Sequence, residues 1–379
     1  MEQNRAKQLF KKCADDTNNM KWAKPTHSSK GEIDRAGQIL ISDIAREEEK
    51  NKALEILTNW RAIHSYPMHV FKIRLKESSQ KIDNNALTAQ RLKRVPSIIK
   101  KLKREYEGRP ATMNLSQMQD IAGCRAVLLN ASQVRKLYEQ YYLKGDIKHK
   151  KVGVKDYIKN PKKDGYRSLH LIYSYSSDKK MKKIYNGLLV EVQIRSKLQH
   201  LWATAIETVD FFTRQAIKSN EGEKEWRDFF RLVSSAFAKM EDCPIVPNTP
   251  EDEKELHSQI KKKEAELKVI DKMKNWTTAV KHFSETAKSS PNAEFFLLEL
   301  DIFGEKLTYR AYTKKQEETA ISDYAELEKK FQGRKEYDVV LVGVDKLSDL
   351  KKAYPNYFVD TGEFLQNLQK ILKKTSNGR

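Results

Sequence analysis

The sequence predicts an α+β fold, in which a mixed β-sheet is flanked by helices, a helical region precedes it and a small ββαβα module follows it. Apolar residues recur at helical spacing over residues 34–60. From about residue 91, segments with strand-like alternation mix with helical segments. The stretch "CPIVPNTPED" (residues 243–252) contains three prolines and precedes a second group of strands and helices, which indicates a boundary between units.

The length of 379 residues exceeds that of most single domains, so we expect more than one unit. No segment repeats at a fixed period. Shifts in composition divide the chain into a helical N-terminal region (1–64), an α+β domain (65–242), a proline-rich linker with a charged helix (243–289) and a C-terminal module with a regulatory or a structural role (290–379).

The first half of the chain supplies helices and one buried strand. Residues 1–62 read as helical with a break at "KWAKPTHSSKG", and a helix or turn follows near 81–90. Pro96 opens the next predicted helix, which ends near Gly108. The remaining predictions are a short helix in "NLSQMQDIAG", a buried strand in "CRAVLL" and an amphipathic helix in "SQVRKLYEQYYLK".

The second half begins with two strands, "RSLHLIYSY" and "LLVEVQIRS", in which apolar and polar residues alternate. Two long helices follow, "LQHLWATAIETVDFFTRQAI" and "EKEWRDFFRLVSSAFAKM". Beyond the proline-rich boundary we expect a charged helix at about 250–289 and a hairpin of "AEFFLLELDIF" and "KLTYRAYT". A helix, the strand "YDVVLVGV" and two more helices complete the C-terminal module.

The charge of the chain indicates an anionic ligand. Lysine and arginine number 72 against 52 acidic residues, a net charge of +20 that attracts nucleotides, RNA, DNA or anionic lipid. The alternative is a lysine-rich surface without a binding role. No apolar run is long enough for a membrane span, and the first residues lack a signal peptide. Three widely spaced cysteines fit the cytoplasm and argue against a zinc site or a disulfide framework.

One polar row lies on the strand "LLVEVQIRS". Glu191, Gln193 and Arg195 share a strand face opposite Val190, Val192 and Ile194, which by itself fits an ordinary solvent face. Asp120 precedes the neighbouring strand candidate, and as a lone residue it would be read as a cap. Two carboxylates on adjacent strands among lysines fit a Mg²⁺-dependent phosphoryl or nucleotidyl transfer, with Asp120 and Glu191 as metal ligands and Glu191 as base.

Two basic segments accompany these carboxylates. The run from Arg91 to Arg104 contains seven cationic side chains and no acidic one, and Ser97 lies four residues before Lys101 near a predicted helix N-terminus. It indicates a phosphate site, or otherwise a solvated cationic face. The stretch "KDGYRSLHLIYSY" (163–175) opens with a glycine, an aromatic ring and cationic residues. Tyr166 offers a ring to a base, and His170 orients a neighbour or packs. The cationic side chains within reach of phosphates are Lys162, Lys163 and Arg167.

With these four elements together, residues 91–210 resemble the RelA/SpoT synthetase domain of the alarmone-synthesising nucleotide pyrophosphokinases, which has a nucleotidyltransferase-like fold. The motifs that carry the resemblance are "RLKRVPSIIKK", "DIAGCR", "DYIKNPKKDGYRSLH" and "VEVQIRS" followed by His200 and Ala203. Four motifs in the same order are specific, whereas each of them alone is weak.

The resemblance implies transfer of pyrophosphate from ATP to the 3′-hydroxyl of GDP or GTP. The implied ATP-binding residues are Arg91, Lys93, Ser97, Lys101 and Arg125. Asp120 and Glu191 would hold Mg²⁺, and Gln193 would assist Glu191 at the catalytic strand. The implied acceptor-binding residues are Tyr166, Lys163, Arg167, His170, Arg195 and His200.

Two departures leave the acceptor open. Asp164 stands where the family usually has asparagine, and the helix after the catalytic strand, "LQHLWATAIETVDFF", lacks the usual glutamate and histidine placement. No His-Asp dipeptide occurs, so we expect a protein without the hydrolase domain of the bifunctional members. The alternatives are a toxin that uses the same chemistry on adenine nucleotides or on the 3′-CCA end of tRNA, and a non-catalytic RNA- or nucleotide-binding protein. The sequence leaves oligomeric state and trigger open.

Overall fold

The computed structural model describes residues 22–26, 29–106, 109–110, 113–213, 224–271, 273, 293–301, 306–331, 334, 337–343 and 362–374. The predicted helical stretch at 1–21, much of the charged helix at 274–289 and the helix expected just after residue 344 lie outside these residues. No helix in the described ranges is long and apolar enough to cross a membrane.

One eight-stranded mixed sheet forms the centre of the described chain, with the strand order β5-β6-β7-β4-β1-β10-β8-β9. Strands β4 and β7 are parallel, and the other neighbours are antiparallel. The strands of the sheet are β1 (Leu87–Leu92), β4 (Ala122–Leu128), β5 (Lys150–Asp156), β6 (Leu169–Ser174), β7 (Leu189–Ser196), β8 (Phe295–Asp301), β9 (Lys306–Tyr312) and β10 (Tyr337–Gly343). A separate short pair joins β2 (Glu105–Tyr106) to β3 (Arg109–Pro110).

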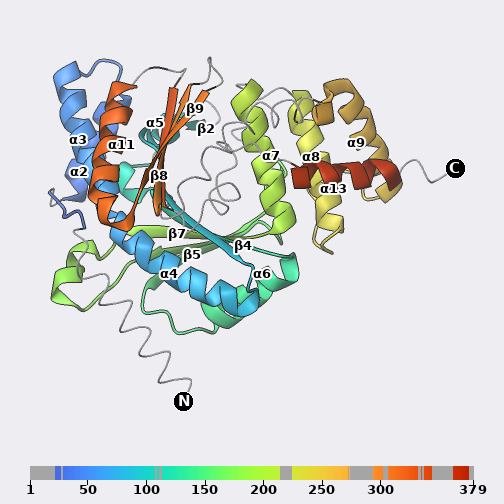
Figure 1. Ribbon diagram of the computed structural model, residues 1–379, viewed down its shortest axis with the longest axis horizontal. Helices are drawn as coiled ribbons and strands as arrows, with labels where there is room; N and C mark the ends of the chain where they lie inside the picture. Colours follow the sequence, from blue (N-terminus) through green and yellow to red (C-terminus); the bar gives the residue numbers. More distant parts are fainter. Residues whose placement is uncertain are drawn as a thin grey trace.

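The sheet is flanked by helices, as the sequence predicts (Figure 1). Helices α2 (Lys30–Ile41) and α3 (Glu47–Ile63) form the expected helical N-terminal region. The next helices are α4 (Ser65–Ile82), α5 (Val95–Leu102), α6 (Ala131–Leu137), α7 (Lys197–Thr213), α8 (Lys224–Lys239), α9 (Glu253–Leu267), α11 (Glu317–Lys330) and α13 (Gly362–Lys374).

Four apolar clusters hold the described elements together, one of which packs α11 on β8, β9 and β10. The largest packs α4 and α6 against one face of β4, β6 and β7 through residues such as Phe71, Val134 and Val192. A second joins α7, α8, α9 and α13, with Phe364 of α13 fully buried among them. A third joins α2, α3 and α5. The opposite face of the central strands is thereby left for polar side chains.

Two segments differ from the sequence prediction. The region near 81–90, expected as helix or turn, contains the first residues of β1, and β1 continues through Arg91 into what was expected to be one basic helix. That basic run is therefore part strand, part loop and part helix, because α5 begins at Val95. The C-terminal hairpin and its third strand form as predicted, but β10 pairs with β1 at Gln90 and Gly343, so the C-terminal strands continue the central sheet.

Candidate active site

The register of the sheet brings polar side chains into one row. Residues directly opposite each other on neighbouring strands point to the same face. On β7, Gln193 lies opposite both Arg125 of β4 and His170 of β6, and His170 in turn lies opposite Lys155 of the edge strand β5. Four strands thus contribute one row of polar and cationic residues to the face away from α4.

Glu191 belongs to the next row on the same face. Its partner on β4 is Gly123, and the partner of Gly123 on β1 is Arg91. A Cβ atom added to Gly123 would meet nothing nearer than the carbonyl oxygen of Arg91 at 3.8 Å. Arg91 and Glu191 lie two strands apart, so their backbones are separated by about 10 Å. Because Gly123 lies between them, no side chain covers the sheet surface there.

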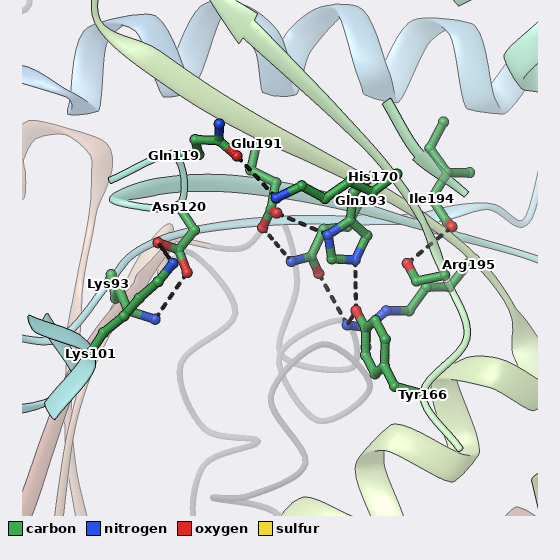
Figure 2. A network of polar contacts seen from close by, with 12 residues as sticks. Lys93, Lys101, Gln119, Asp120, Tyr166, His170, Glu191, Gln193, Ile194 and Arg195 are labelled. Atoms are coloured by element: carbon green, nitrogen blue, oxygen red, sulfur yellow. Dashed lines mark hydrogen bonds and ion pairs between the residues drawn. The ribbon is translucent and has the colours of Figure 1, made fainter. Parts of the chain in front are cut away.

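Five side chains form a closed ring of hydrogen bonds around Glu191 (Figure 2). On one arm, Arg195 contacts the Tyr166 hydroxyl at 2.7 Å, this hydroxyl contacts Nε2 of His170 at 2.7 Å, and Nδ1 of His170 contacts Oε1 of Glu191 at 2.9 Å. On the other arm, Arg195 donates to Oε1 of Gln193 at 3.1 Å, and Nε2 of Gln193 donates to Oε2 of Glu191 at 2.7 Å. Both carboxylate oxygens are therefore held.

All hydrogen bonds of the ring run from Arg195 towards Glu191. Since a guanidinium has no acceptor, Arg195 donates to Tyr166, which then donates to a neutral His170, and His170 donates to an ionised Glu191. Burial lowers the pKa of His170 and outweighs the opposing effect of Glu191. Burial raises the pKa of Glu191, but the hydrogen bonds from His170 and Gln193 more than offset this, so that its pKa is lowered. The ring thus presents a carboxylate of fixed orientation.

Asp120 forms a second cluster beside the ring, in the turn before β4 (Figure 2). Its oxygens accept from Lys93 at 3.1 Å and from Lys101 at 2.8 Å. Burial raises the pKa of Asp120, but the two ammonium groups outweigh burial and lower it to about 2. Lys93 follows β1 and Lys101 lies on α5, so the two halves of the basic run converge on one carboxylate.

The ring of Tyr166 lies in an aromatic and cationic environment. Its centroid is 5.9 Å from that of Tyr157 and 6.5 Å from that of Trp202 on α7, in both cases edge to face. The ammonium group of Lys162 lies 5.2 Å from the Tyr166 centroid and 4.6 Å from that of Tyr157. A planar base that stacks on Tyr166 would therefore lie close to the ammonium group of Lys162.

The predicted site residues separate into groups. Arg91, Lys93, Lys101, Asp120 and Arg125 lie on or beside the site face of the sheet, as do Tyr166, His170, Glu191, Gln193 and Arg195. Ser97 is half-buried in the first turn of α5, and Lys163 is exposed next to Lys162.

One acceptor-site prediction needs correction. Arg167, expected to reach phosphates, has a side chain that is 1% exposed, and it pairs with the buried Glu241 at 3.6 Å. It faces α8 because residues alternate on either side of the strand entrance, and Tyr166 points the other way. His200 is buried on α7, and its role in acceptor binding stays a prediction.

Asp164 acts within its own turn. One of its oxygens accepts from the backbone N–H of Tyr166 at 2.9 Å, a bond that an asparagine side chain also makes. The substitution of aspartate for asparagine therefore keeps the shape of the loop and adds a negative charge.

Sequence reasoning missed Lys155 and Gln119 and did not fix the direction of Lys162. Lys155 donates to Oε1 of Gln119 at 3.0 Å beside Asp120, and Lys162, rather than Lys163, covers the tyrosines. The signal for Lys162 was the run of lysines itself, in which the direction of each side chain is not encoded. Lys155 requires the strand β5, which the sequence does not reveal.

The described residues contain no cluster of three or more His, Cys, Asp or Glu side chains that would hold a metal ion by themselves. The carboxylates of the site fit a cation that binds one or two protein carboxylates and completes its coordination shell with substrate phosphates and water, as Mg²⁺ does. Asp120 and Glu191 would supply oxygen ligands of that kind, and their charges interact, since Asp120 raises the pKa of Glu191.

Comparisons with known proteins single out the same part of the chain. Residues 90–211 match the family described as "Region found in RelA / SpoT proteins". GTP pyrophosphokinase YjbM of Bacillus subtilis (strain 168) is 31% identical over 121 residues, which are 32% of this chain and 54% of the relative. GTP pyrophosphokinase YwaC of the same strain is 32% identical over 117 residues, 31% of this chain and 54% of the relative. The chain spans about half the length of these curated relatives.

Among solved structures, small alarmone synthetase 2 from Bacillus subtilis is similar over 49% of this chain and 94% of its own, with 23% identity and a TM-score of 0.40. Small alarmone synthetase 1 of the same organism is similar over 47% of this chain and 88% of its own, with 24% identity and a TM-score of 0.38. The family match covers every residue of the Glu191 ring and the Asp120 cluster. Residues 90–211 of this chain match the RelA/SpoT region, as the four motifs predict.

Proposed function

We propose that this protein is an ATP:nucleotide 3′-pyrophosphotransferase that moves pyrophosphate from ATP to the 3′-hydroxyl of GDP or GTP. One observation carries the proposal: an ionised, doubly held Glu191 lies on the same sheet face as Asp120, Lys93, Lys101 and the cationic side chains of β1 and β4. The family match and the two related GTP pyrophosphokinases support the same reaction class.

Glu191 is the general base in this proposal. The acceptor's 3′-oxygen attacks the β-phosphorus of ATP, the bond from that phosphorus to the α,β-bridging oxygen breaks, and AMP leaves with the bond's electron pair. The hydroxyl proton passes to Glu191, whose lowered pKa keeps it ionised near neutral pH. Since phosphoryl transfer depends chiefly on positioning and charge neutralisation, the fixed direction of the carboxylate is the main contribution of the ring.

The ATP side is formed by Arg91, Lys93, Ser97, Lys101 and Arg125. Lys93 and Lys101 both contact Asp120, so their ammonium groups converge at one point beside the open sheet surface of Gly123. A triphosphate there would bring the negative charge that this concentration of cations favours. Asp120 and Glu191 would hold Mg²⁺, which would neutralise charge on the transferred phosphates when bound.

The acceptor side is formed by Tyr166 and its cationic neighbours. Tyr166 stacks on the base, Lys162 and Lys163 lie towards its phosphates, and the Tyr166 hydroxyl connects the bound base to His170 and Glu191. This arrangement links occupancy of the base site to the orientation of the catalytic carboxylate.

The test is an acceptor panel. The purified protein is incubated with Mg²⁺ and ATP labelled at the γ-phosphate, with GDP, GTP, AMP, ATP and bulk tRNA offered separately and Glu191→Gln as control. Label on GDP or GTP that disappears in the control supports the proposal. Transfer to none of the acceptors by the wild-type protein would overturn it.

A second candidate is the same transfer to the 3′-end of tRNA, in a protein that arrests growth. It is favoured by the edge strand β5, whose Lys150, Lys151 and Lys155 are exposed on the strand that ends beside the site. Together with the net charge of +20, this surface suits an RNA backbone better than a single small nucleotide. Label on tRNA alone, with a steep loss of transfer between 50 and 200 mM salt, would favour this candidate over the first.

A further inference from the structure

Helix α8 lies outside the matched region, which ends at residue 211, yet it contacts the loop that carries Tyr166. We infer that α8 is part of the acceptor site: Ser234 is a positioning residue that fixes the Tyr166 loop, and the buried pair of Arg167 and Glu241 supports it. This inference rests on the proposed function, because it assigns the loop to acceptor binding.

The first support is a short hydrogen-bond chain through Ser234. Its hydroxyl donates to the carbonyl oxygen of Gly165 at 2.6 Å and accepts from Nε of Arg167 at 3.2 Å. One hydroxyl therefore holds the residues immediately before and after Tyr166. Ser234 is 1% exposed, so water cannot replace either bond without rearrangement of the helix.

The second support is the packing of Gly165. Its φ of +94° is one that residues with a side chain rarely adopt. A Cβ atom at this position would lie 2.8 Å from Cζ2 of Trp202, 3.2 Å from Cβ of Ser234 and 3.3 Å from Cα of Arg231. The loop is thus pressed against α7 and α8, and the indole of Trp202 is itself tied to α8 by its hydrogen bond to the Phe230 carbonyl at 2.7 Å.

The third support is the charge pair behind the loop. Arg167 and Glu241 have side chains 1% and 3% exposed, and they lie 3.6 Å apart. Gln199 of α7 also contacts Glu241, at 3.4 Å. A buried ion pair contributes little net stability, but it fixes geometry, because either charge alone would be strongly unfavourable in this environment. The pair therefore determines where the backbone of residue 167 lies, and with it the direction of Tyr166.

These contacts give a physical route from α8 to Glu191. Ser234 sets the loop, the loop sets Tyr166, and the Tyr166 hydroxyl reaches Glu191 through His170. Helix α8 is in turn packed against α13, where Phe364 lies 6.1 Å from Phe230 and 5.9 Å from Phe237 between ring centroids (Figure 1). Helices α8 and α13, which follow the RelA/SpoT region in the sequence, thus support the part of the site that binds the acceptor.

The test compares two serines that are neighbours on α8. Ser235 is as buried as Ser234 and also makes hydrogen bonds, but to Thr249 and to the backbone of Val246, on the side away from the Tyr166 loop. Ser234→Ala and Ser235→Ala remove the same atom from adjacent buried positions, so they serve as a matched pair.

We expect Ser234→Ala to raise the KM for GDP about tenfold, because the loop loses both buried hydrogen bonds to the hydroxyl, while the KM for ATP stays within twofold. Ser235→Ala should leave both KM values within twofold, although both variants lower the melting temperature. Equal shifts in the GDP and ATP KM values for Ser234→Ala, or no shift in either, would overturn the inference.

A direct binding measurement separates this inference from the proposed reaction. The affinity of each variant for a fluorescent GDP analogue is measured without ATP. A weaker affinity for Ser234→Ala than for Ser235→Ala supports the role of α8 even if the wild type transfers pyrophosphate to another acceptor. Equal affinities of wild type and both variants for the analogue contradict it.

Discussion

The hydroxyl of Tyr166 and its ring have separate tasks, and one substitution distinguishes them. The hydroxyl joins Arg195 to His170 at 2.7 Å on each side, whereas the ring is the surface for a base. Tyr166→Phe keeps the ring and breaks one arm that holds Glu191. Tyr166→Ala removes both.

We predict that Tyr166→Phe lowers kcat about tenfold with the acceptor KM within twofold, because a hydrogen bond in the orienting network is lost and stacking remains. Tyr166→Ala should raise the acceptor KM about tenfold or more, since stacking contributes ~1–3 kcal/mol. Steady-state kinetics with varied acceptor checks both values. Tyr157→Phe is the control, because Tyr157 contacts Tyr166 but lies outside the ring of hydrogen bonds. An unchanged kcat for Tyr166→Phe would contradict the role of the hydroxyl.

At the scale of elements, the junction between α3 and α4 contains an uncharged histidine. His64 is 1% exposed, and its Nδ1 donates to the Trp60 carbonyl at 2.6 Å. Burial lowers the pKa of His64 to about 4, although the backbone hydrogen bond opposes this shift. The imidazole is therefore neutral in the folded protein at a pH where it would be charged in the unfolded chain.

Because the folded pKa is lowered, the contribution of His64 to stability is complete above pH 6.5 and is lost as pH falls from 6.5 towards 4. We predict that the urea midpoint falls between pH 7 and pH 5. His64→Asn keeps a side-chain N–H for the Trp60 carbonyl and cannot become charged, so its midpoint should fall less over this range. Parallel pH profiles for wild type and His64→Asn would show that His64 does not contribute to the change.

Strong periodicity predicts most elements correctly. The alternation in "LLVEVQIRS" gives β7 and the correct face for Glu191, and the apolar run "CRAVLL" gives β4. Strand β5, by contrast, lies at the edge of the sheet and is exposed on both faces, so "KKVGVKD" lacks the alternation that reveals a half-buried strand. Strand β1 was missed because its polar residues Thr88, Gln90 and Arg91 are divided between both faces, so "LTAQRL" lacks the alternation of a half-buried strand.

The residue types of the site could be predicted from the sequence, but their contacts could not. The closed ring depends on the registers that place His170 and Arg125 opposite Gln193, and register follows from sheet pairing rather than from local sequence. For the same reason the sequence could not show that Arg167 turns towards Glu241 in the turn after α8, 74 positions further along the chain.

At the scale of the whole molecule, the C-terminal segment packs against the rest of the protein in two places, on either side of the site. Strand β10 pairs with β1, the strand that carries Arg91, and Arg61 bridges the Lys93 carbonyl at 2.8 Å and the Tyr324 hydroxyl of α11 at 2.7 Å. Helix α13 packs at the other end against α7, α8 and α9. A separable module would not share a sheet and an apolar cluster with the rest of the protein.

Phe364 tests this integration. Its side chain is fully buried in the cluster of α7, α8, α9 and α13, so Phe364→Ala should lower the free energy of unfolding by about 3–5 kcal/mol. Gln366→Ala, at an exposed position of the same helix, should change it by less than about 0.5 kcal/mol. Denaturant unfolding followed by tryptophan fluorescence measures both values. Similar small effects for both variants would mean that α13 is not part of the folded core.

The central claim is that Glu191, held by His170 and Gln193, is the base of a pyrophosphate transfer. The most direct measurement is the single-turnover rate of label transfer from ATP to its acceptor by Glu191→Gln, with nucleotide affinities measured on the same preparation. The account predicts a loss of about 10²–10⁴-fold in rate with ATP and acceptor affinities within a few fold of the wild type. A rate within tenfold of the wild type would contradict it.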